Sequence, residues 1–304
     1  MKELKLKARA KINLTLDVTG KRENGYHELE MIMQTLSLYD GITLRPLQKD
    51  TIQISCNGAF VPTDSRNLAW KAANLMRHTY HIKEGVAIDI DKRIPVAAGL
   101  AGGSADCAAV LVGMNRLFRL GLSSQRLEEL ALTMGTDIPY CVRRGTVLAT
   151  GLGETLENIR PACPFCYVVL AKPPVGVSTA KVYQGLKWQE IEKHPSAKDM
   201  ISAIAEGNVE KMGTLLGNVL ETVTIPMHPE IHRLKKTMLA KGAAGTLMSG
   251  SGPTVFGLFT DLKKAKRTAA IIRRRFHLKE VFVTQIYNVS EKEKRGGNKN
   301  GCKI

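Results

Sequence analysis

The chain has 304 residues, of which 44% are hydrophobic and 24% charged, and its formal net charge is +16. This apolar fraction is sufficient to bury a core and excludes a disordered chain. No run of about 18 apolar residues occurs, which excludes a membrane-spanning helix. The positive charge predicts an anionic partner, a condition that a nucleic acid, a membrane surface and a nucleotide all satisfy.

The N-terminal region alternates between apolar and polar side chains. Over residues 4–18, apolar side chains take alternate positions over much of the stretch, which predicts a β-strand with one buried face. Lys11 and Asn13 share the opposite face, so both can reach the same ligand. The alternative for Lys11 is a solvated lysine on the polar side of the strand.

Strands and helices alternate along the rest of the chain. A turn is expected at Gly20–Gly25. Strands are expected over 42–46, 51–56, 86–90, 165–171 and 280–288, with a strand pair over 245–259. Helices are expected from an N-cap at Asn67, and over 124–134, 197–221, 229–241 and 262–276. This pattern predicts an α+β fold. We expect domains at 1–160 and 161–290, followed by a frayed, disordered basic tail at 291–304.

The segment between the expected strand at 86–90 and the helix after it is rich in small residues. A helix start presents unpaired N–H groups and a positive dipole end, and glycines let the backbone approach a phosphate closely. Ser104 can cap this helix or bind phosphate or magnesium. The glycine spacing fits neither a Walker A loop nor a dinucleotide-binding fingerprint. The segment therefore predicts a phosphate loop, with a ligand-free strand–helix turn as the alternative. Its residues are Pro95, Val96, Ala97, Ala98, Gly99, Leu100, Ala101, Gly102, Gly103, Ser104 and Ala105.

A second glycine- and serine-rich stretch, Met248–Thr254, resembles the first. We expect it to pack against the phosphate loop and cover the phosphates, or else to be an ordinary hairpin turn.

Six cysteines are present. Their spacing does not indicate a small disulfide scaffold, so we expect reduced thiols and a cytoplasmic protein. Cys163 and Cys166 have redox-motif spacing but lead into a strand, which favours packing thiols. His228 and His232 are not in a zinc-protease order, and Pro229 indicates a helix start instead.

Three stretches together resemble the GHMP kinases, the superfamily of galactokinase, homoserine kinase and mevalonate kinase. They are Lys11–Asn13, Pro95–Ala105 and Ser249–Pro253. The resemblance implies an N-terminal domain like ribosomal protein S5 domain 2 and a C-terminal ferredoxin-like domain, with the site between them. It also implies ATP and Mg²⁺ as cofactors. Alanines stand at positions 97, 98 and 101, where some relatives carry glycine.

Further motifs resemble one branch of that superfamily, which phosphorylates the 2-hydroxyl of a cytidylated methylerythritol in isoprenoid biosynthesis. They are Ala10–Leu14, Gly25–Leu29 and Asp137–Pro139. The resemblance implies that Asp137 is the general base and Lys11 its cationic partner. From the residues alone, Asp137 could instead be a helix N-cap.

The same resemblance implies a slot for the cytidine base. Tyr26 would stack on the base and His27 would hydrogen bond to it. Thr179 and Tyr183 would form the second wall, although a core tyrosine is an alternative for Tyr183. Asn13 would hold the substrate beside Lys11.

Two other functions stay open from the sequence. One is a different GHMP kinase, acting on homoserine or mevalonate. The other is an RNA-binding protein that uses the basic residues over 263–275. For a kinase we expect a cytidylated small molecule and ATP as partners, no membrane or nucleic acid, and a monomer or homodimer.

Overall fold

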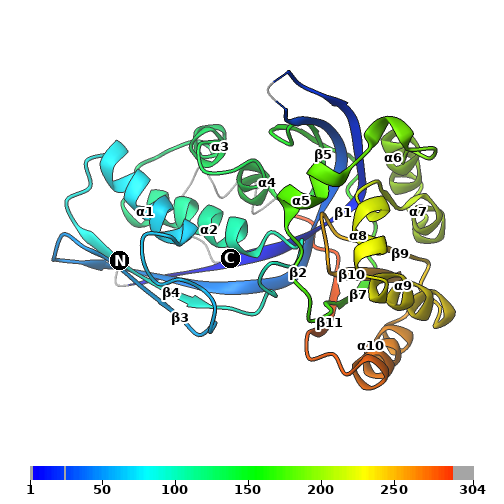
Figure 1. The fold of residues 1–304 in the computed structure, drawn as a ribbon. Helices are drawn as coiled ribbons and strands as arrows, with labels where there is room; N and C mark the ends of the chain where they lie inside the picture. Colours follow the sequence, from blue (N-terminus) through cyan, green and yellow to red (C-terminus); the bar gives the residue numbers. More distant parts are fainter. Residues whose placement is uncertain (1–2, 24, 290–304) are drawn as a thin grey trace.

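The computed structural model describes residues 3–23 and 25–289, so the tail predicted at 291–304 lies outside the described residues. Among the described residues, seven strands form a mixed sheet in the order β3-β4-β2-β1-β8, with β5 beside β2 and β6 beside β5 (Figure 1). These strands are β1 (Leu4–Lys21), β2 (His27–Leu47), β3 (Ile52–Cys56), β4 (Gly85–Asp91), β5 (Thr146–Gly151), β6 (Thr155–Asn158) and β8 (Gly217–Asn218).

Helices cover one face of this sheet, bringing apolar side chains together with those of β1, β2 and β4. They are α1 (Leu68–Thr79), α2 (Gly102–Leu117), α3 (Ser124–Leu132) and α4 (Ile138–Arg143). Asn67 caps α1 through its side chain, as predicted. The strand expected over 42–46 is part of a longer one: β2 runs from His27 to Leu47 and pairs with β1.

The second sheet is antiparallel, in the order β11-β7-β10-β9. Its strands are β7 (Tyr167–Ala171), β9 (Gly245–Met248), β10 (Val255–Phe259) and β11 (Val281–Gln285). The helices α9 (Glu230–Ala240) and α10 (Leu262–Phe276) pack on one face, and α6 (Ala197–Ala205) and α7 (Val209–Leu215) on the other. The remaining helices are α5 (Thr179–Gly185), α8 (Glu221–Met227) and a 3₁₀ turn at Trp188–Glu190.

The single helix predicted over 197–221 is wrong. Gly207 has a φ of 67°, a left-handed conformation that ends the helical turn after α6. Asn208 then caps α7 by accepting a hydrogen bond from the Lys211 amide. The following segment returns to the first sheet as β8. The domain boundary near residue 160 stays a prediction. The chain passes from the first sheet to the second between Asn158, the end of β6, and Tyr167, the start of β7. It returns to the first sheet later, when β8 pairs with β1.

One apolar cluster joins the two sheets. It contains Ile12 and Leu14 of β1 together with Leu170 of β7 and Phe256 of β10, all buried. A large apolar interface of this kind opposes independent movement of the two halves. The relative position of residues from both halves is therefore fixed, which a site between them requires.

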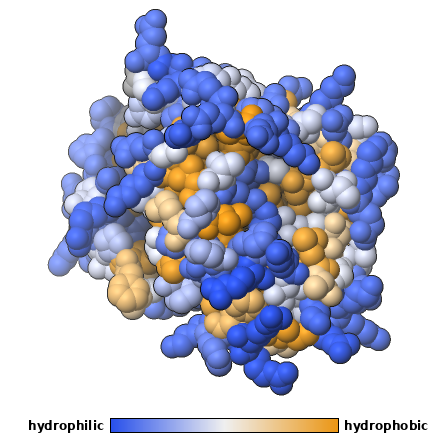
Figure 2. Space-filling model, turned by 45° about the vertical axis from the view of Figure 1, so that its right-hand side comes forward, coloured by the Kyte–Doolittle hydropathy of each residue, from blue (hydrophilic) through white to orange (hydrophobic). Residues whose placement is uncertain are grey.

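Hydrophilic side chains form most of the periphery of the face in Figure 2, and hydrophobic ones gather nearer its middle. Within residues 3–23 and 25–289, no helix has both the length and the apolar composition needed to cross a bilayer.

The joint core predicts that stability depends on Phe256. We expect Phe256→Ala to lower the free energy of unfolding by about 3–5 kcal/mol, because it opens a cavity between the two sheets. Urea unfolding followed by circular dichroism measures this change. Phe60, which is 91% exposed, provides the control: Phe60→Ala should change the value by less than about 0.5 kcal/mol. Equal effects of both substitutions would contradict the joint core.

Candidate active site

A cleft of about 560 Å³ lies between the two halves. Its lining combines the polar side of β1, the phosphate loop, the start of α4, the first residues of α5 and the loop after β9. The residues from these segments include Lys11, Asn13, Ala97, Gly99, Gly102, Ser104, Asp137, Thr179, Tyr183, Gly250 and Ser251. A pocket of this size and shared lining is typical of a small-molecule site.

The phosphate loop enters α2 through left-handed turns. Ala97, Gly99 and Ala101 have φ values of 50°, 73° and 55°. Ala101 is the N-cap of α2 and has no side chain that can cap it. The amide groups at the start of α2 are therefore free of a capping side chain and suited to an anion. Ser104 lies inside the first turn, so its predicted capping role is wrong, although its hydroxyl lines the cleft.

The loop after β9 packs against the phosphate loop, as predicted. A Cβ atom on Gly99 would lie 2.1 Å from the Ser249 carbonyl oxygen, so only glycine permits this approach. The Ser249 hydroxyl donates a hydrogen bond of 2.9 Å to the Gly99 carbonyl. Asn218 of β8 donates to the Met248 and Gly250 carbonyls at 2.8 Å each. These contacts hold the two glycine-bearing loops on either side of one space.

Lys11, Asn13 and Asp137 meet beside the phosphate loop. Lys11 Nζ donates to Asn13 Oδ1 at 2.7 Å and lies 3.8 Å from Asp137 Oδ2. Lys11 is 4% exposed and Asn13 is fully buried, so the solvated-lysine alternative is wrong. Asp137 stands at the N-cap position of α4, but its side chain makes no capping hydrogen bond. The carboxylate is therefore available to a ligand in the cleft.

At the other end, Tyr183 lines the cleft, and the His27 ring packs against it from outside the lining. The His27 and Tyr183 rings lie 5.4 Å apart with an interplanar angle of 31°. Thr179, one turn before Tyr183, shares a 2.8 Å hydrogen bond with Ser251. Burial, together with the Lys21 charge, lowers the pKa of His27, so its imidazole is neutral at pH 7 and can both donate and accept. Tyr26 is 62% exposed, and like His27 it is not among the residues that line the cleft.

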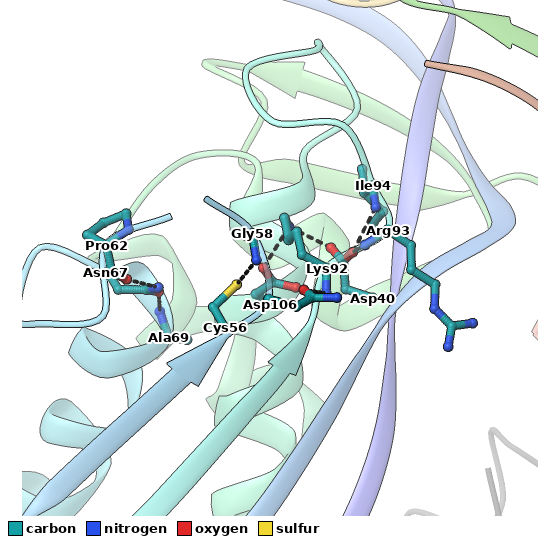
Figure 3. Close-up of polar contacts among 11 residues, drawn as sticks. Asp40, Cys56, Gly58, Pro62, Asn67, Ala69, Lys92, Arg93, Ile94 and Asp106 are labelled. Atoms are coloured by element: carbon teal, nitrogen blue, oxygen red, sulfur yellow. Dashed lines mark hydrogen bonds and ion pairs between the residues drawn. The ribbon is translucent and has the colours of Figure 1, made fainter. Parts of the chain in front are cut away.

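A buried charge cluster next to the phosphate loop was missed by the sequence analysis. Lys92 Nζ donates to Asp40 Oδ2 at 2.6 Å and to Asp106 Oδ2 at 2.8 Å (Figure 3). The other oxygen of Asp40 accepts from the Arg93 and Ile94 amides. The cluster thereby ties β2, the segment after β4 and α2 together. No local sequence pattern marked Asp40, Lys92 or Asp106.

Asp106 carries the main electrostatic perturbation of this cluster. Burial raises its pKa from 3.8 to about 8, with a further contribution from Asp40, although the Lys92 ammonium acts in the opposite direction. Asp106 Oδ1 is buried and has no hydrogen-bond partner among the described residues. Burial therefore favours the protonated form of Asp106.

Asn67, the N-cap of α1, lies at the edge of the cleft. Asn67 lines the cleft, but its side chain is engaged: it donates to the Pro62 carbonyl at 2.7 Å and accepts from the Ala69 amide at 2.8 Å (Figure 3). These bonds hold the segment before α1 at the rim of the cleft.

The cysteine pair and the histidine pair noted in the sequence do not line the cleft. Cys163 and Cys166 are buried, and burial raises the pKa of both thiols, that of Cys166 to about 12. Raised pKa values oppose thiolate chemistry, which agrees with packing thiols. Pro229 is the N-cap of α9, as expected from the sequence.

Family models match both halves of the chain. The GHMP kinases N terminal domain matches residues 67–145, and the GHMP kinases C terminal model matches residues 200–278. A solved structure of 4-(cytidine 5'-diphospho)-2C-methyl-D-erythritol kinase superposes with a TM-score of 0.80 at 31% identity, covering 94% of this chain and 100% of that one. A solved structure of L. major mevalonate kinase, at 16% identity and a TM-score of 0.74, covers 95% of this chain and 98% of that one and shares the fold.

Curated relatives extend over most of the chain. The 4-diphosphocytidyl-2-C-methyl-D-erythritol kinase of Bacillus subtilis is 54% identical over 261 residues, covering 86% of this chain and 90% of the relative. The protein of the same name from Lachnospira eligens is 46% identical over 287 residues, covering 94% and 99%.

The fold and the site define an ATP-dependent small-molecule kinase of the GHMP class. Within that class, the chain belongs to the family of 4-diphosphocytidyl-2-C-methyl-D-erythritol kinases. The predicted family and the α+β GHMP kinase fold are confirmed.

The charge cluster generates a pH prediction. Because the folded protein holds the Asp106 proton up to about pH 8, this stabilising contribution is complete below the unfolded value of 3.8 and is lost as the pH rises through about 8. We expect the free energy of unfolding to fall between pH 5 and 9 more steeply in the parent than in Asp106→Asn. Urea unfolding at several pH values measures the two slopes.

Asp64 supplies the matched control for this experiment. Its hydrogen bonds to Arg66 lower its pKa to about 2, so it contributes no slope above pH 5. Asp64→Asn should keep the parent slope. If Asp106→Asn also keeps it, the protonated Asp106 is refuted.

Proposed function

We propose that this chain transfers the γ-phosphate of ATP to the 2-hydroxyl of 4-diphosphocytidyl-2-C-methyl-D-erythritol, yielding the 2-phosphate and ADP on the methylerythritol phosphate route to isoprenoids. The observation that carries the proposal is the position of Asp137, 3.8 Å from Lys11, in the same cleft as the uncapped start of α2. The names of the curated relatives support the substrate.

The phosphate loop would bind the ATP phosphates through the amide groups at the start of α2. Gly99 keeps the loop after β9 in contact, so the two loops enclose the phosphates and exclude water. Phosphoryl transfer depends chiefly on positioning and charge stabilisation, both of which this enclosure supplies.

Asp137 would accept the proton of the attacking hydroxyl. The buried Lys11 ammonium lies within ion-pair distance of this carboxylate and orients it. Lys11 can also stabilise charge on the transferred phosphoryl group. Asn13 holds Lys11 in place by accepting its hydrogen bond.

Magnesium is implied by the kinase class. Among the described residues, no group of three or more His, Cys, Asp or Glu side chains is arranged to hold a metal. The Ser104 hydroxyl and the Asp137 carboxylate line the cleft and fit an ion carried mainly by ATP oxygens and water. When bound, Mg²⁺ neutralises phosphate charge.

At the far end, the neutral His27 would hydrogen bond to the cytosine edge, with Tyr183 beside it and Thr179 on the same wall. A site that hydrogen bonds to a base rejects analogues that leave its polar groups unpaired. We further propose a cytoplasmic monomer or homodimer, in keeping with the free thiols of the five described cysteines.

Asp137→Asn tests the general base. We expect kcat to fall by about 10³-fold, because the amide cannot accept the proton while the fold is retained. Coupled ADP production measures this loss. Asp261, the N-cap of α10, is the matched control because it is also an aspartate at a helix start. Asp261→Asn should turn over at the parent rate. Turnover of Asp137→Asn near that rate would refute the assignment.

Tyr183→Ala tests the base slot. We expect KM for the cytidylated substrate to rise by about 10-fold or more while KM for ATP stays within about twofold, since a base-stacking contact contributes about 1–3 kcal/mol. Steady-state kinetics with each substrate varied separates the two. Tyr26→Ala should have the smaller effect, because Tyr26 lies outside the cleft. An equal rise in both KM values would argue against a base slot.

A further inference from the structure

A second, smaller cavity of about 30 Å³ lies between β1, α2 and α4. Its lining includes Lys7, Arg9, Arg116 and Arg144 and no acidic residue of the described chain. β8 pairs only with Thr15 and Leu16, so it leaves the first half of β1 uncovered on this side. The cavity therefore opens beside a strand edge and shares no lining residue with the catalytic cleft.

Arg116 and Arg144 have no charge partner. Both are half-buried, yet neither side chain makes a hydrogen bond or ion pair with another residue of the described ranges. Arg143, the last residue of α4, shows the usual arrangement: it bonds to both oxygens of Glu128 in α3 and to the Leu156 carbonyl. A half-buried guanidinium without an acceptor has lost hydrogen bonds to water, and no protein hydrogen bond compensates for this desolvation cost.

The two arginines also act on each other. Burial lowers the pKa of Arg116, and repulsion from Arg144 lowers it further. An anion between them would reverse this repulsion.

The backbone at Arg144 is an independent observation. Arg144 has φ 63° and ψ 178°, a region that is essentially restricted to glycine. Such strain persists where the surrounding structure fixes it, and it concentrates at ligand-binding sites. In this protein the strained residue, Arg144, lies at the end of α4 and lines the cavity.

Helix dipoles explain only part of the arrangement. Arg116 lies in the last turn of α2 and Arg144 is the C-cap of α4, where cations are favoured. Each helix end supplies about half a negative charge, so two helix ends do not neutralise two arginines. Guanidinium groups bind phosphate oxygens in bidentate fashion.

We propose that Arg116 and Arg144 form a second anion site, which binds a phosphoryl oxyanion outside the catalytic cleft. Two helices connect this site to the reaction. The same α2 that ends near Arg116 begins at the phosphate loop, and the same α4 that ends at Arg144 begins after Asp137.

The test uses the full chain with its catalytic cleft saturated by Mg²⁺ and a non-hydrolysable ATP analogue. Inorganic phosphate is titrated at constant ionic strength against chloride, and the thermal unfolding midpoint is followed. We expect a saturable rise with phosphate in the parent. Arg116→Met and Arg144→Met should each weaken the apparent affinity by about tenfold or more, because each removes one bidentate contact.

Arg119 provides the matched control. It lies just beyond α2, has a φ of 53° and is exposed, and it does not line the cavity. Arg119→Met should bind phosphate like the parent, and Arg116→Lys should retain part of the affinity. A parent without a saturable response, or equal losses in all three methionine variants, would overturn the proposal. If Arg144→Met fails to fold, Arg116→Met and Arg116→Lys decide the question alone.

Discussion

Amide groups at the start of α2 can receive phosphate only because the preceding loop holds left-handed turns and an N-cap without a capping side chain. The rest of the site is arranged around that helix end. Gly99 admits the loop after β9 to within contact of the phosphate loop. The Lys11 amide donates to the Leu100 carbonyl at 3.1 Å, which fixes β1, and with it the Lys11 side chain, at a set distance from the loop.

The apolar cluster between the two sheets fixes the relative position of site residues that come from the two halves of the chain. Thr179 and Tyr183 come from the second half of the chain, while Lys11 and Asp137 come from the first. Their separation depends on buried contacts such as those of Phe256, because no covalent link fixes it. Burial also gives the Lys11 charge its effect, since an ion pair away from water is screened little.

Much of this was accessible from the sequence, because local patterns carried it. Alternation placed Lys11 and Asn13 on one face of β1, and small residues before a helix marked the phosphate loop. The spacing of motifs identified the family, which brought Asp137 and Tyr183 into consideration. The Lys92 cluster was inaccessible for a physical reason: Asp40, Lys92 and Asp106 are far apart in sequence and meet only through tertiary packing. The resemblance placed Tyr26 in the slot with His27, but Tyr26 precedes β2 and is 62% exposed.

The charge of Asp106 connects the cluster to the chemistry. Lys92 contributes one positive charge to two buried carboxylates, so a proton on Asp106 leaves the cluster neutral. An ionised Asp106 would place a net negative charge under the first turn of α2, opposing the dipole that attracts phosphate. A raised pKa of Asp106 therefore favours an electropositive helix start. Arg116 at the other end of α2 complements the negative end of the same dipole. With Asp106 protonated, the N-terminal end of α2 adds no negative charge beside the phosphate loop. At the C-terminal end, Arg116 lies where the dipole is negative. Both features favour binding of an anionic nucleotide at the start of α2.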